Sequence, residues 1–488
     1  MSLNFNNNEE LEPLIRSSHG PDGPRRSVWL AVELPLFLLL FSSSLTDTVT
    51  YNLLLYRTCI VELEYNSTTC ALLNILNKTG EAKDLETEVQ SEASILVTTI
   101  SVFSSIMPAV LAVFLGSWSD KYGRKPLVVW PLFGQFLTAV LTVVFSAVQY
   151  LSAYWFILCI MPFAMLGGFS TIMLGANLIT TDITNEEDRS FRLALIQGCG
   201  FAGVLTGTIG SSYVYDFIGY VPLFTLSAAI YFFTLLYTIV LVEETLVIAE
   251  RGGLCKIFNC NLIKDMARTC FKKRYLSITA ILTLLITAFA ITMFCIFGIS
   301  AVDYLFTRQK FQWLLKEYST FCAVNIIIGL VGMYIGMSFF QSYCKMSDGM
   351  LLILSYVSSI CDATVRSLSQ KSWHLYLAGM MSILGSLSPP LIRSQISKVL
   401  PKGEIAKMYS LVSCVEAVMP IFAPILFNWA YYCTLVVFPG FIYVISGGLF
   451  TVCLVLVIFA NILYYRVVKN RSQINPFLEE DVCTENDQ

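Results

Sequence analysis

Long apolar stretches alternate with shorter polar segments along almost the whole chain. Each stretch is about 20 residues long or longer, the length that an α-helix needs to cross the hydrocarbon core of a bilayer. Twelve such stretches occur, at about residues 27–54, 93–116, 127–148, 153–179, 193–214, 220–243, 276–304, 318–343, 349–367, 373–397, 407–429 and 436–463. The pattern predicts an all-α membrane protein with 12 transmembrane helices, because a β-barrel would show alternating segments of about ten residues instead.

The longest polar segments divide this pattern into two halves of six predicted spans. A polar head covers residues 1–26, the first half covers 27–243, and the second half covers 276–463. A basic linker at 244–275 separates the halves, and a tail runs from 464 to 488. We therefore expect two six-helix bundles in one chain.

Composition and charge exclude a water-soluble protein and give the spans a direction. Of 488 residues, 56% are apolar and 13% are charged, whereas soluble chains have about 45–50% and about 25%. The formal net charge of −3 gives no basic surface for nucleic acid. Most of the 31 Lys and Arg residues fall on the side of the head and the tail, so the positive-inside rule predicts that both termini are cytosolic.

The segment at residues 55–92 is the one long loop predicted to face outside. It carries Asn-X-Ser/Thr sequons at Asn66 and Asn77, which predict N-glycosylation if the loop enters the secretory lumen; the alternative is chance, because the pattern is short. Cys59 and Cys70 lie in the same loop, and they either form a disulfide there or stay as two free thiols. The chain lacks Cys and His spacing typical of zinc sites, and we expect no metal and no cofactor.

A motif of glycines and charges follows the second predicted span. Within residues 116–126, Gly116, Asp120, Gly123, Arg124 and Lys125 form the pattern G-x-x-x-D-x-x-G-R-K. The first glycine allows close approach of a neighbouring helix, and the second permits a tight turn. The aspartate stands at a helix end, where it can pair with the arginine or cap a facing helix. We interpret this lock motif as a conformational lock rather than as an ordinary basic loop.

The lock motif, its position and the two sets of six spans resemble the major facilitator superfamily. Two further stretches are similar to the proton-coupled folate transporter family, solute carrier family 46. Residues 189–196 (RSFRLALI) resemble its R-T-F-R-M-A-L stretch, and residues 393–399 (RSQISKV) resemble its R-x-x-L-S-K-x-V stretch. The resemblance implies the major facilitator fold and a secondary transporter that works by alternating access, not an enzyme. Its implied cargo is a folate-like or muropeptide-like organic anion, with protons as the driving ion.

The chain departs from the folate carriers at positions that carry their chemistry. Gln197 stands where they have a proton-coupling Glu in span five, and Gly168 stands where they have an Asp in span four. Folate transport by the same mechanism is therefore not expected. Gln197 remains a candidate for substrate or proton handling through this match of position.

Three ionisable residues within predicted spans are further candidates, because a charge in a bilayer is costly and therefore points to function. Glu416 lies near the middle of span eleven, where transporters bind substrate, and it could take up a proton from an acidic lumen. Arg393 matches an arginine that the family uses in transport, and its guanidinium can bind a carboxylate with two N–H groups. Asp47 faces the central cavity or its outer mouth. For Glu416 the alternative is a neutral acid that hydrogen-bonds between helices, and for Arg393 it is an arginine that extends to the cytosolic surface, as the positive-inside rule would place it.

Other polar and small residues receive simpler interpretations. Gly203 and Gly207 form a G-x-x-x-G pair that favours close helix crossing, either in a span that rocks or in static packing. Asp362 and Arg366 are four residues apart and are expected to pair. Asp182 is interpreted as ordinary loop charge.

The head contains a candidate address. Glu10, Leu14 and Ile15 fit an acidic dileucine signal, which clathrin adaptors read as an extended peptide; chance is again the alternative. The expected partners are thus a small organic solute, protons, membrane lipid and a clathrin adaptor, in a lysosomal, endosomal or plasma membrane. The alternative function is a non-transporting receptor or scaffold on the same fold.

Overall fold

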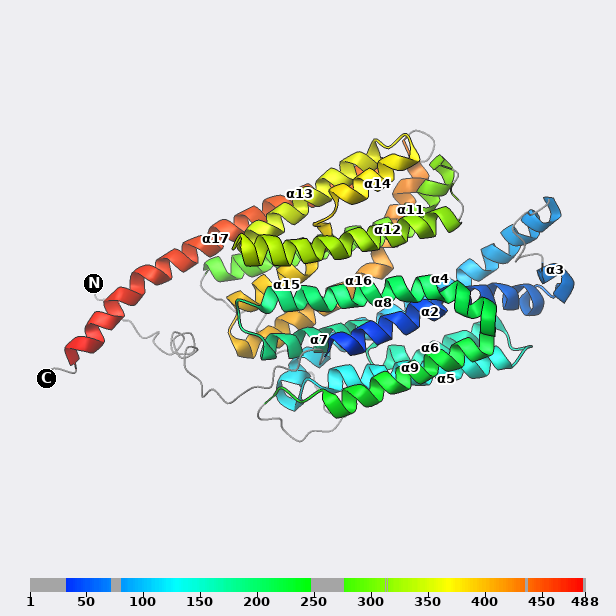
Figure 1. Ribbon diagram of the computed structural model, residues 1–488, viewed down its shortest axis with the longest axis horizontal. Coiled ribbons are helices and arrows are strands. Elements are labelled where there is room, and N and C mark those ends of the chain that lie inside the picture. Colours follow the sequence, from blue (N-terminus) through cyan, green and yellow to red (C-terminus); the bar gives the residue numbers. More distant parts are fainter. Residues whose placement is uncertain are drawn as a thin grey trace.

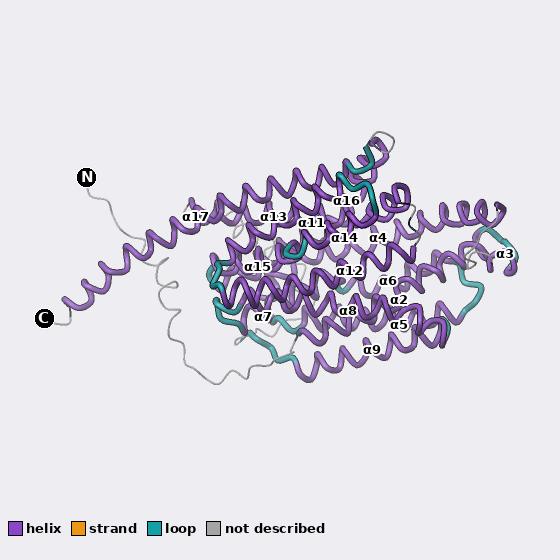
Figure 2. The backbone as a smooth tube through the Cα atoms, turned by 45° about the horizontal axis from the view of Figure 1, so that its top comes forward, coloured by secondary structure: helices purple, strands orange, loops and turns teal. Residues whose placement is uncertain are grey.

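The structure is a computed structural model that describes residues 32–71, 80–246, 276–311, 313, 315–434 and 438–485. The described chain is built of helices, most of which run side by side along the long axis of the molecule (Figures 1 and 2). The helices fall into two bundles that follow one another in the sequence.

The first half occupies the lower part of Figure 1. Its elements are α2 (Glu33–Arg57), η2 (Thr58–Glu62), α3 (Ser67–Ala71), α4 (Gly80–Tyr122), α5 (Pro126–Ala147), η4 (Ala153–Trp155), α6 (Phe156–Met165), α7 (Gly168–Ile183), α8 (Arg189–Ile218) and α9 (Tyr220–Leu241). Helix α2 packs along α8 and α9, and α5 packs against α6 and α9.

The second half lies above it in the same view. Its elements are α11 (Leu276–Phe311), α12 (Leu315–Tyr334), η6 (Ile335–Tyr343), α13 (Asp348–Ser367), α14 (Ser372–Met381), η7 (Gly385–Leu387), α15 (Ser388–Val399), α16 (Lys402–Thr434) and α17 (Phe441–Glu485). Helix α11 packs against α16 and α17. The two halves meet where α4 packs along α16 and where α8 packs against α12 and α15.

The helical membrane architecture is confirmed, but the number of spans is confirmed only in part. In the described chain, ten helices are long and apolar enough to cross a bilayer, and a pair bent by 47° (Ser372–Met381 and Gly385–Val399) makes an eleventh. The predicted span at 93–116 lies in α4 (Gly80–Tyr122), whose described side chains include the apolar stretch Val102–Ala112.

Two segments predicted as loop and tail are helical instead. Residues 80–92, which we placed in the outer loop, form the start of α4, and residues 464–485, which we placed in the tail, extend α17. The first segment contains several Glu, Ala and Lys residues, which are good helix formers although most of them are polar. Hydropathy therefore marked where these helices enter apolar surroundings and not where they begin or end.

The predicted span at 153–179 is a broken helix. Gly167 and Gly168 have φ angles of 106° and 57° between α6 and α7, a left-handed backbone that glycine adopts without a Cβ clash. Several predictions cannot be placed: Glu10, Leu14 and Ile15 of the sorting signal, Asn77, and residues 247–275 of the linker lie outside the described residues.

Candidate functional site

One end of the bundle, called here the lock end, gathers the polar elements of the chain. The antiparallel order of the helices brings together the last residues of α4, α7, α9, η6 and α15 with the first residues of α5, α8, α13 and α16. This end carries the lock motif and a large cavity.

Arg124 is the centre of the lock motif. It is 4% exposed, and its guanidinium reaches two carboxylates: Nη2 lies 2.9 Å from Asp120 Oδ1, and Nε lies 3.3 Å from Asp182 Oδ2. Nη1 donates to Ser119 Oγ at 2.8 Å. The interpretation of Asp182 as loop charge is wrong, because the end of α7 brings its carboxylate to the motif.

Glu244, just after α9, completes the motif from the other side. Its carboxylate accepts the backbone N–H of Arg124 at 2.7 Å and that of Lys125 at 3.0 Å. Lys125 Nζ donates to the carbonyl of Ile239 at 2.6 Å. Gly123 has φ 121°, and a Cβ there would lie 2.5 Å from Glu244 Oε2, so the turn requires glycine. Sequence reasoning missed Glu244, which is about 120 residues away from the motif.

Gly116 lies within α4, and only its backbone conformation is described. It therefore stays a prediction that a neighbouring helix approaches closely at this glycine. The hydrogen bonds of Arg124 and Lys125 tie α4, α5, α7 and α9 together, and Asp120 also attracts Lys407 of α16 in the second half.

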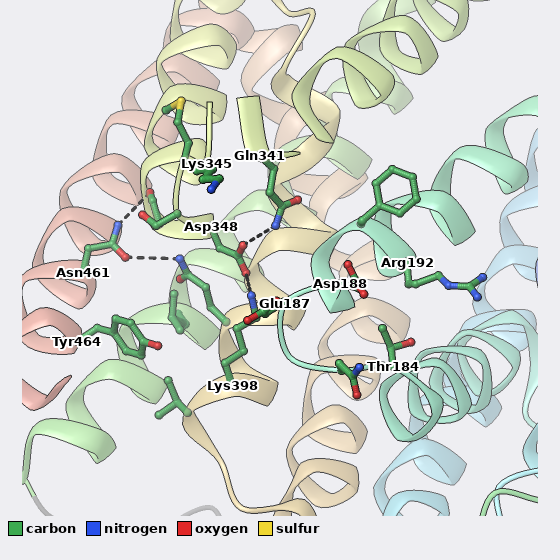
Figure 3. Close-up of a pocket in the computed structure, with 18 of the residues that line it drawn as sticks. Thr184, Glu187, Asp188, Arg192, Gln341, Lys345, Asp348, Lys398, Asn461 and Tyr464 are labelled. Carbon is green, nitrogen blue, oxygen red and sulfur yellow. Dashed lines mark hydrogen bonds and ion pairs between the residues drawn. The ribbon is translucent and has the colours of Figure 1, made fainter. Parts of the chain in front are cut away.

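A second polar network joins the two halves at the lock end, and Figure 3 shows the part of it in which Gln341 and Lys398 bind Asp348. Asp348, the first residue of α13, accepts hydrogen bonds at Oδ2 from Ser190 Oγ (2.6 Å), Ser394 Oγ (2.9 Å) and Lys398 Nζ (2.7 Å). Its Oδ1 accepts from Gln341 Nε2 at 2.9 Å. Because Ser190 belongs to the first half and the other four residues belong to the second, the carboxylate binds the halves together.

Both contributing stretches are those that resemble solute carrier family 46. Ser190 lies in residues 189–196, and Ser394 and Lys398 lie in residues 393–399. A further bond joins the same stretches, from Arg189 Nη1 to Ser397 Oγ at 3.1 Å. No pattern in the sequence marks Asp348 as the acceptor between them.

The inter-half network borders a cavity of about 980 Å³. Its walls come from the α7–α8 loop and the start of α8, and from α11, η6, α13, α15 and α17. Acidic and basic side chains line it in balance, among them Glu187, Asp188, Lys345, Asp348 and Lys398. This cavity contains none of the four residues predicted to handle substrate or protons.

Two of those four residues form a buried ion pair. Arg393 Nη2 lies 2.6 Å from Glu416 Oε2, and the two side chains are 4% and 15% exposed. The guanidinium also lies over the ring of Phe289, with 5.0 Å from Cζ to the ring centroid. The carbonyl of Arg393 accepts the Tyr409 hydroxyl at 2.9 Å. The pair thus joins α15 to α16 beside an aromatic side chain of α11.

The other two predicted residues lie elsewhere. Asp47 on α2 lines a separate cavity of about 270 Å³ inside the first half, and Ser43 Oγ donates to it at 3.4 Å. Gln197 is half-buried in α8 and lines neither cavity. The structure therefore brings Arg393 and Glu416 together, whereas Asp47 and Gln197 lie apart from this pair.

The G-x-x-x-G pair lies at the crossing of α8 with α2. A Cβ on Gly203 would lie 2.5 Å from the carbonyl oxygen of Phe37, and one on Gly207 would meet the carbonyl oxygen of Phe41. The close approach of these helix backbones therefore requires glycine at both positions.

Residues of the outer loop and the opposite end of the second half also form contacts. Cys59 and Cys70 form a disulfide with a Cα–Cα distance of 5.9 Å, and Asn66 is exposed at the start of α3.

Arg366 Nε pairs with Asp362 at 2.8 Å, as its spacing predicted, and Nη1 also reaches Asp303 at 3.5 Å.

Comparison with known sequences identifies relatives over most of the chain. The family described as Major Facilitator Superfamily matches residues 36–424. The "Probable peptidoglycan muropeptide transporter SLC46" of Drosophila melanogaster is 28% identical over 435 residues, which are 86% of this chain and 83% of that protein. The "Lysosomal proton-coupled steroid conjugate and bile acid symporter SLC46A3" of Gallus gallus is 22% identical over 86% of this chain and 91% of that protein. The "Proton-coupled folate transporter" of Rattus norvegicus is 24% identical over 87% and 91%.

Solved structures share the fold. The human organic anion transporter MFSD10 superposes with a TM-score of 0.67 at 15% identity, over 89% of this chain and all of that one. The fucose:proton symporter FucP of E. coli superposes with a TM-score of 0.60 at 13% identity, over 88% and 97%. At these identities the likeness establishes the fold alone.

Proposed function

Because the chain belongs to the Major Facilitator Superfamily, we propose that it is a proton-coupled secondary transporter of small organic anions. As a member related to solute carrier family 46, it is a multi-pass transporter-family protein and not an enzyme. Folates, bile acids and muropeptides, named for its relatives, all carry carboxylates. The observation that carries the proposal is the buried Arg393–Glu416 pair, which can exchange one carboxylate for another.

The exchange follows from charge balance at the pair. Truncating or neutralising one partner of a buried ion pair leaves the other charge uncompensated, at a cost of about 3–5 kcal/mol. When Glu416 takes up a proton, the guanidinium of Arg393 loses its counter-ion and attracts the carboxylate of a substrate. When the substrate leaves, Glu416 releases its proton and the pair forms again. Proton and anion therefore bind together, and the total charge of the site is the same before and after.

Alternating access fits the contacts at the lock end. The bonds that Asp348 and Ser397 accept from the first half hold this end of the bundle together. We propose that the lock end faces the cytosol, as the distribution of Lys and Arg predicts. Opening there would break these bonds and weaken the attraction between Asp120 of the lock motif and Lys407 of the second half.

Transport in proteoliposomes tests the proposal. The purified chain is reconstituted and uptake is measured with an outer pH of 5 or 7, using a panel of a folate, a muropeptide fragment and a steroid conjugate. We expect uptake of at least one solute to rise with the proton gradient. In Glu416→Gln the gradient should lose its effect while exchange of labelled for unlabelled solute persists, because the neutral amide mimics the protonated acid.

Arg393→Lys serves as the companion variant. It keeps the charge but loses the planar pair of N–H donors, so the KM for the anion should rise roughly tenfold or more. Normal amounts of folded protein that move no solute of the panel at either pH, yet bind a protein partner, would favour the alternative of a receptor or scaffold. Gradient-driven uptake that survives in Glu416→Gln would refute the coupling mechanism.

We also propose a lysosomal or endosomal location, with the plasma membrane as the alternative. One relative is named lysosomal. The dileucine pattern of Glu10, Leu14 and Ile15 is of the kind that a clathrin adaptor recognises. Substituting Leu14 and Ile15 by Ala in the full chain should move a fluorescent fusion to the cell surface. An unchanged distribution would contradict the sorting role.

A further inference from the structure

Arg189 is a buried cation that the exchange at Arg393 and Glu416 does not use. It is the first residue of α8 and is 4% exposed. Its guanidinium donates from Nη1 to Ser397 Oγ at 3.1 Å, and in the described chain it makes no ion pair. Its Nε is buried and has no hydrogen-bond partner among the described residues.

The interface around Arg189 gives this cation no counter-charge. Asp348, the acid of the inter-half network, pairs with Lys398 instead. Glu187 and Asp188 precede Arg189 in the chain, but their side chains are exposed. The N-terminus of a helix also carries a partial positive charge, which opposes a cation there. A charge buried without a partner is costly, so the closed lock end keeps Arg189 in an unfavourable place, which points to a function in another state of the protein.

Arg189 and Arg393 lie near the same phenol. The positive charges of both act on Tyr409, which is buried and donates its hydroxyl to the carbonyl of Arg393 at 2.9 Å. Arg393 lies six residues before the end of α15, about 9 Å along the helix axis, whereas Arg189 lies at the lock end itself. The two guanidinium groups therefore follow one another from the buried ion pair toward the lock end.

We propose that Arg189 is a second binding residue for the carboxylate of the solute, occupied when the lock end opens. This role rests on the transport function proposed above. When Glu416 releases its proton and pairs with Arg393 again, the solute carboxylate loses its first partner. Opening separates Arg189 from Ser397 of the other half, and the freed guanidinium offers the carboxylate two N–H donors in one plane. The carboxylate thus keeps a cationic partner until it reaches water.

Competition between an acid and its methyl ester measures this contact at one face of the membrane. The full chain is reconstituted at a low ratio of protein to lipid, with Cys433 at the opposite end replaced by Ser. Vesicles with the lock end outward are collected by an impermeant biotin reagent on the exposed Cys344. A folate, a bile acid and a muropeptide fragment are each tested beside their own methyl ester. Initial uptake at pH 7 gives the KM of the acid and the Ki of the ester.

We expect the preference for acid over ester to fall roughly tenfold in Arg189→Gln at the lock-end face. At the opposite face, measured in the vesicles that are not collected, the preference should stay unchanged, because the solute meets Arg393 from that side without passing Arg189. Arg189→Lys keeps the charge but not the planar pair of donors, so its preference should lie between those of the wild type and Arg189→Gln.

Ser397→Ala is the matched control, because it removes the acceptor of Arg189 and leaves the guanidinium in place. A change in how often the lock end opens alters the KM of the acid and the Ki of the ester by the same factor. The control should therefore keep the wild-type preference for the acid.

The outcomes separate the role of Arg189 from the transport function. Wild-type uptake with an unchanged preference in Arg189→Gln overturns the role of Arg189 alone. An equal loss of preference in Ser397→Ala also overturns it, and would show that Arg189 only holds the halves together. Folded wild-type protein that takes up none of the acids overturns both proposals. If Arg189→Gln does not fold, Arg189→Lys decides, and a wild-type preference in that variant overturns the role of Arg189.

Discussion

Ser190→Ala tests whether the Asp348 network holds the lock end closed. Ser190 lies in α8 of the first half and donates to Asp348 of the second half at 2.6 Å. Both residues are buried. When the halves separate at this end, the bond must break and both groups become hydrated. Its net free energy therefore contributes directly to the equilibrium between the closed and open forms of the lock end.

The size of the effect follows from the charge of the acceptor. A hydrogen bond to a charged group contributes about 1.5–3 kcal/mol, and each 1.4 kcal/mol changes an equilibrium about tenfold. Asp348 keeps Ser394 and Lys398 as donors in the variant, so no buried charge loses all its partners. If about 1% of wild-type molecules are open at this end, the variant should have about 10% to 60% open.

Distances between spin labels across the lock end measure this change. Cysteines at Glu186 and Tyr343, both exposed and on opposite halves, carry the labels, in a chain whose other accessible cysteines are replaced. Ser355→Ala is the matched control, because its buried hydroxyl bonds only within the second half, to the carbonyl of Leu384 and to Ser388. Unchanged distance distributions in Ser190→Ala, or an equal change in the control, would show that the Asp348 network does not hold the lock end closed.

Three further predictions concern packing and stability in the full chain. Gly123→Ala places a Cβ at φ 121°, against the carboxylate that follows α9; it should cost about 1–3 kcal/mol, and an unchanged thermal midpoint would contradict the requirement for glycine. In Gly203→Ala the new Cβ lies 2.5 Å from a backbone carbonyl oxygen of α2, whereas in Gly210→Ala the nearest atom is a leucine methyl at 3.4 Å. Only Gly203→Ala should reduce the stability, by about 1–3 kcal/mol, which lowers its thermal midpoint. Equal thermal midpoints of the two variants would argue against the tight crossing. Replacing Cys59 and Cys70 by Ser removes a cross-link over 11 residues and should lower the stability by about 3 kcal/mol. The variant should have a lower thermal midpoint than the wild type, and reducing agent should lower the midpoint of the wild type only. If reducing agent leaves the wild-type midpoint unchanged, the disulfide does not contribute to stability.

The sequence predicted the helices better than their ends. Hydropathy located the apolar part of nearly every long helix, because each residue contributes to it independently of the rest of the fold. It failed where a helix continues in polar residues, as at Gly80 and in the extension of α17. It also failed to show the break at Gly167 and Gly168, because a glycine pair in an apolar run is equally compatible with a straight helix.

The candidate site was predictable as single residues but not as contacts. A charge within an apolar stretch is visible in the sequence, which is why Arg393 and Glu416 were chosen. Their pairing depends on how α15 and α16 are rotated against each other, and no local pattern records that rotation. Asp182 shows the same limit, since its sequence neighbours are loop charges and its partner, Arg124, lies 58 residues earlier.

The sequence alone determined that this chain is a helical membrane protein of a transporter family, with a lock motif and few charges at membrane depth. These features follow from side chains that must be buried in lipid or excluded from it, a requirement that each segment meets by itself. Only the tertiary structure decided that Asp348 joins the halves, that Asp47 stands alone in its own cavity and that Arg393 faces Glu416. Such assignments depend on the relative position of helices far apart in the chain, where a shift of one helical face exchanges one partner for another.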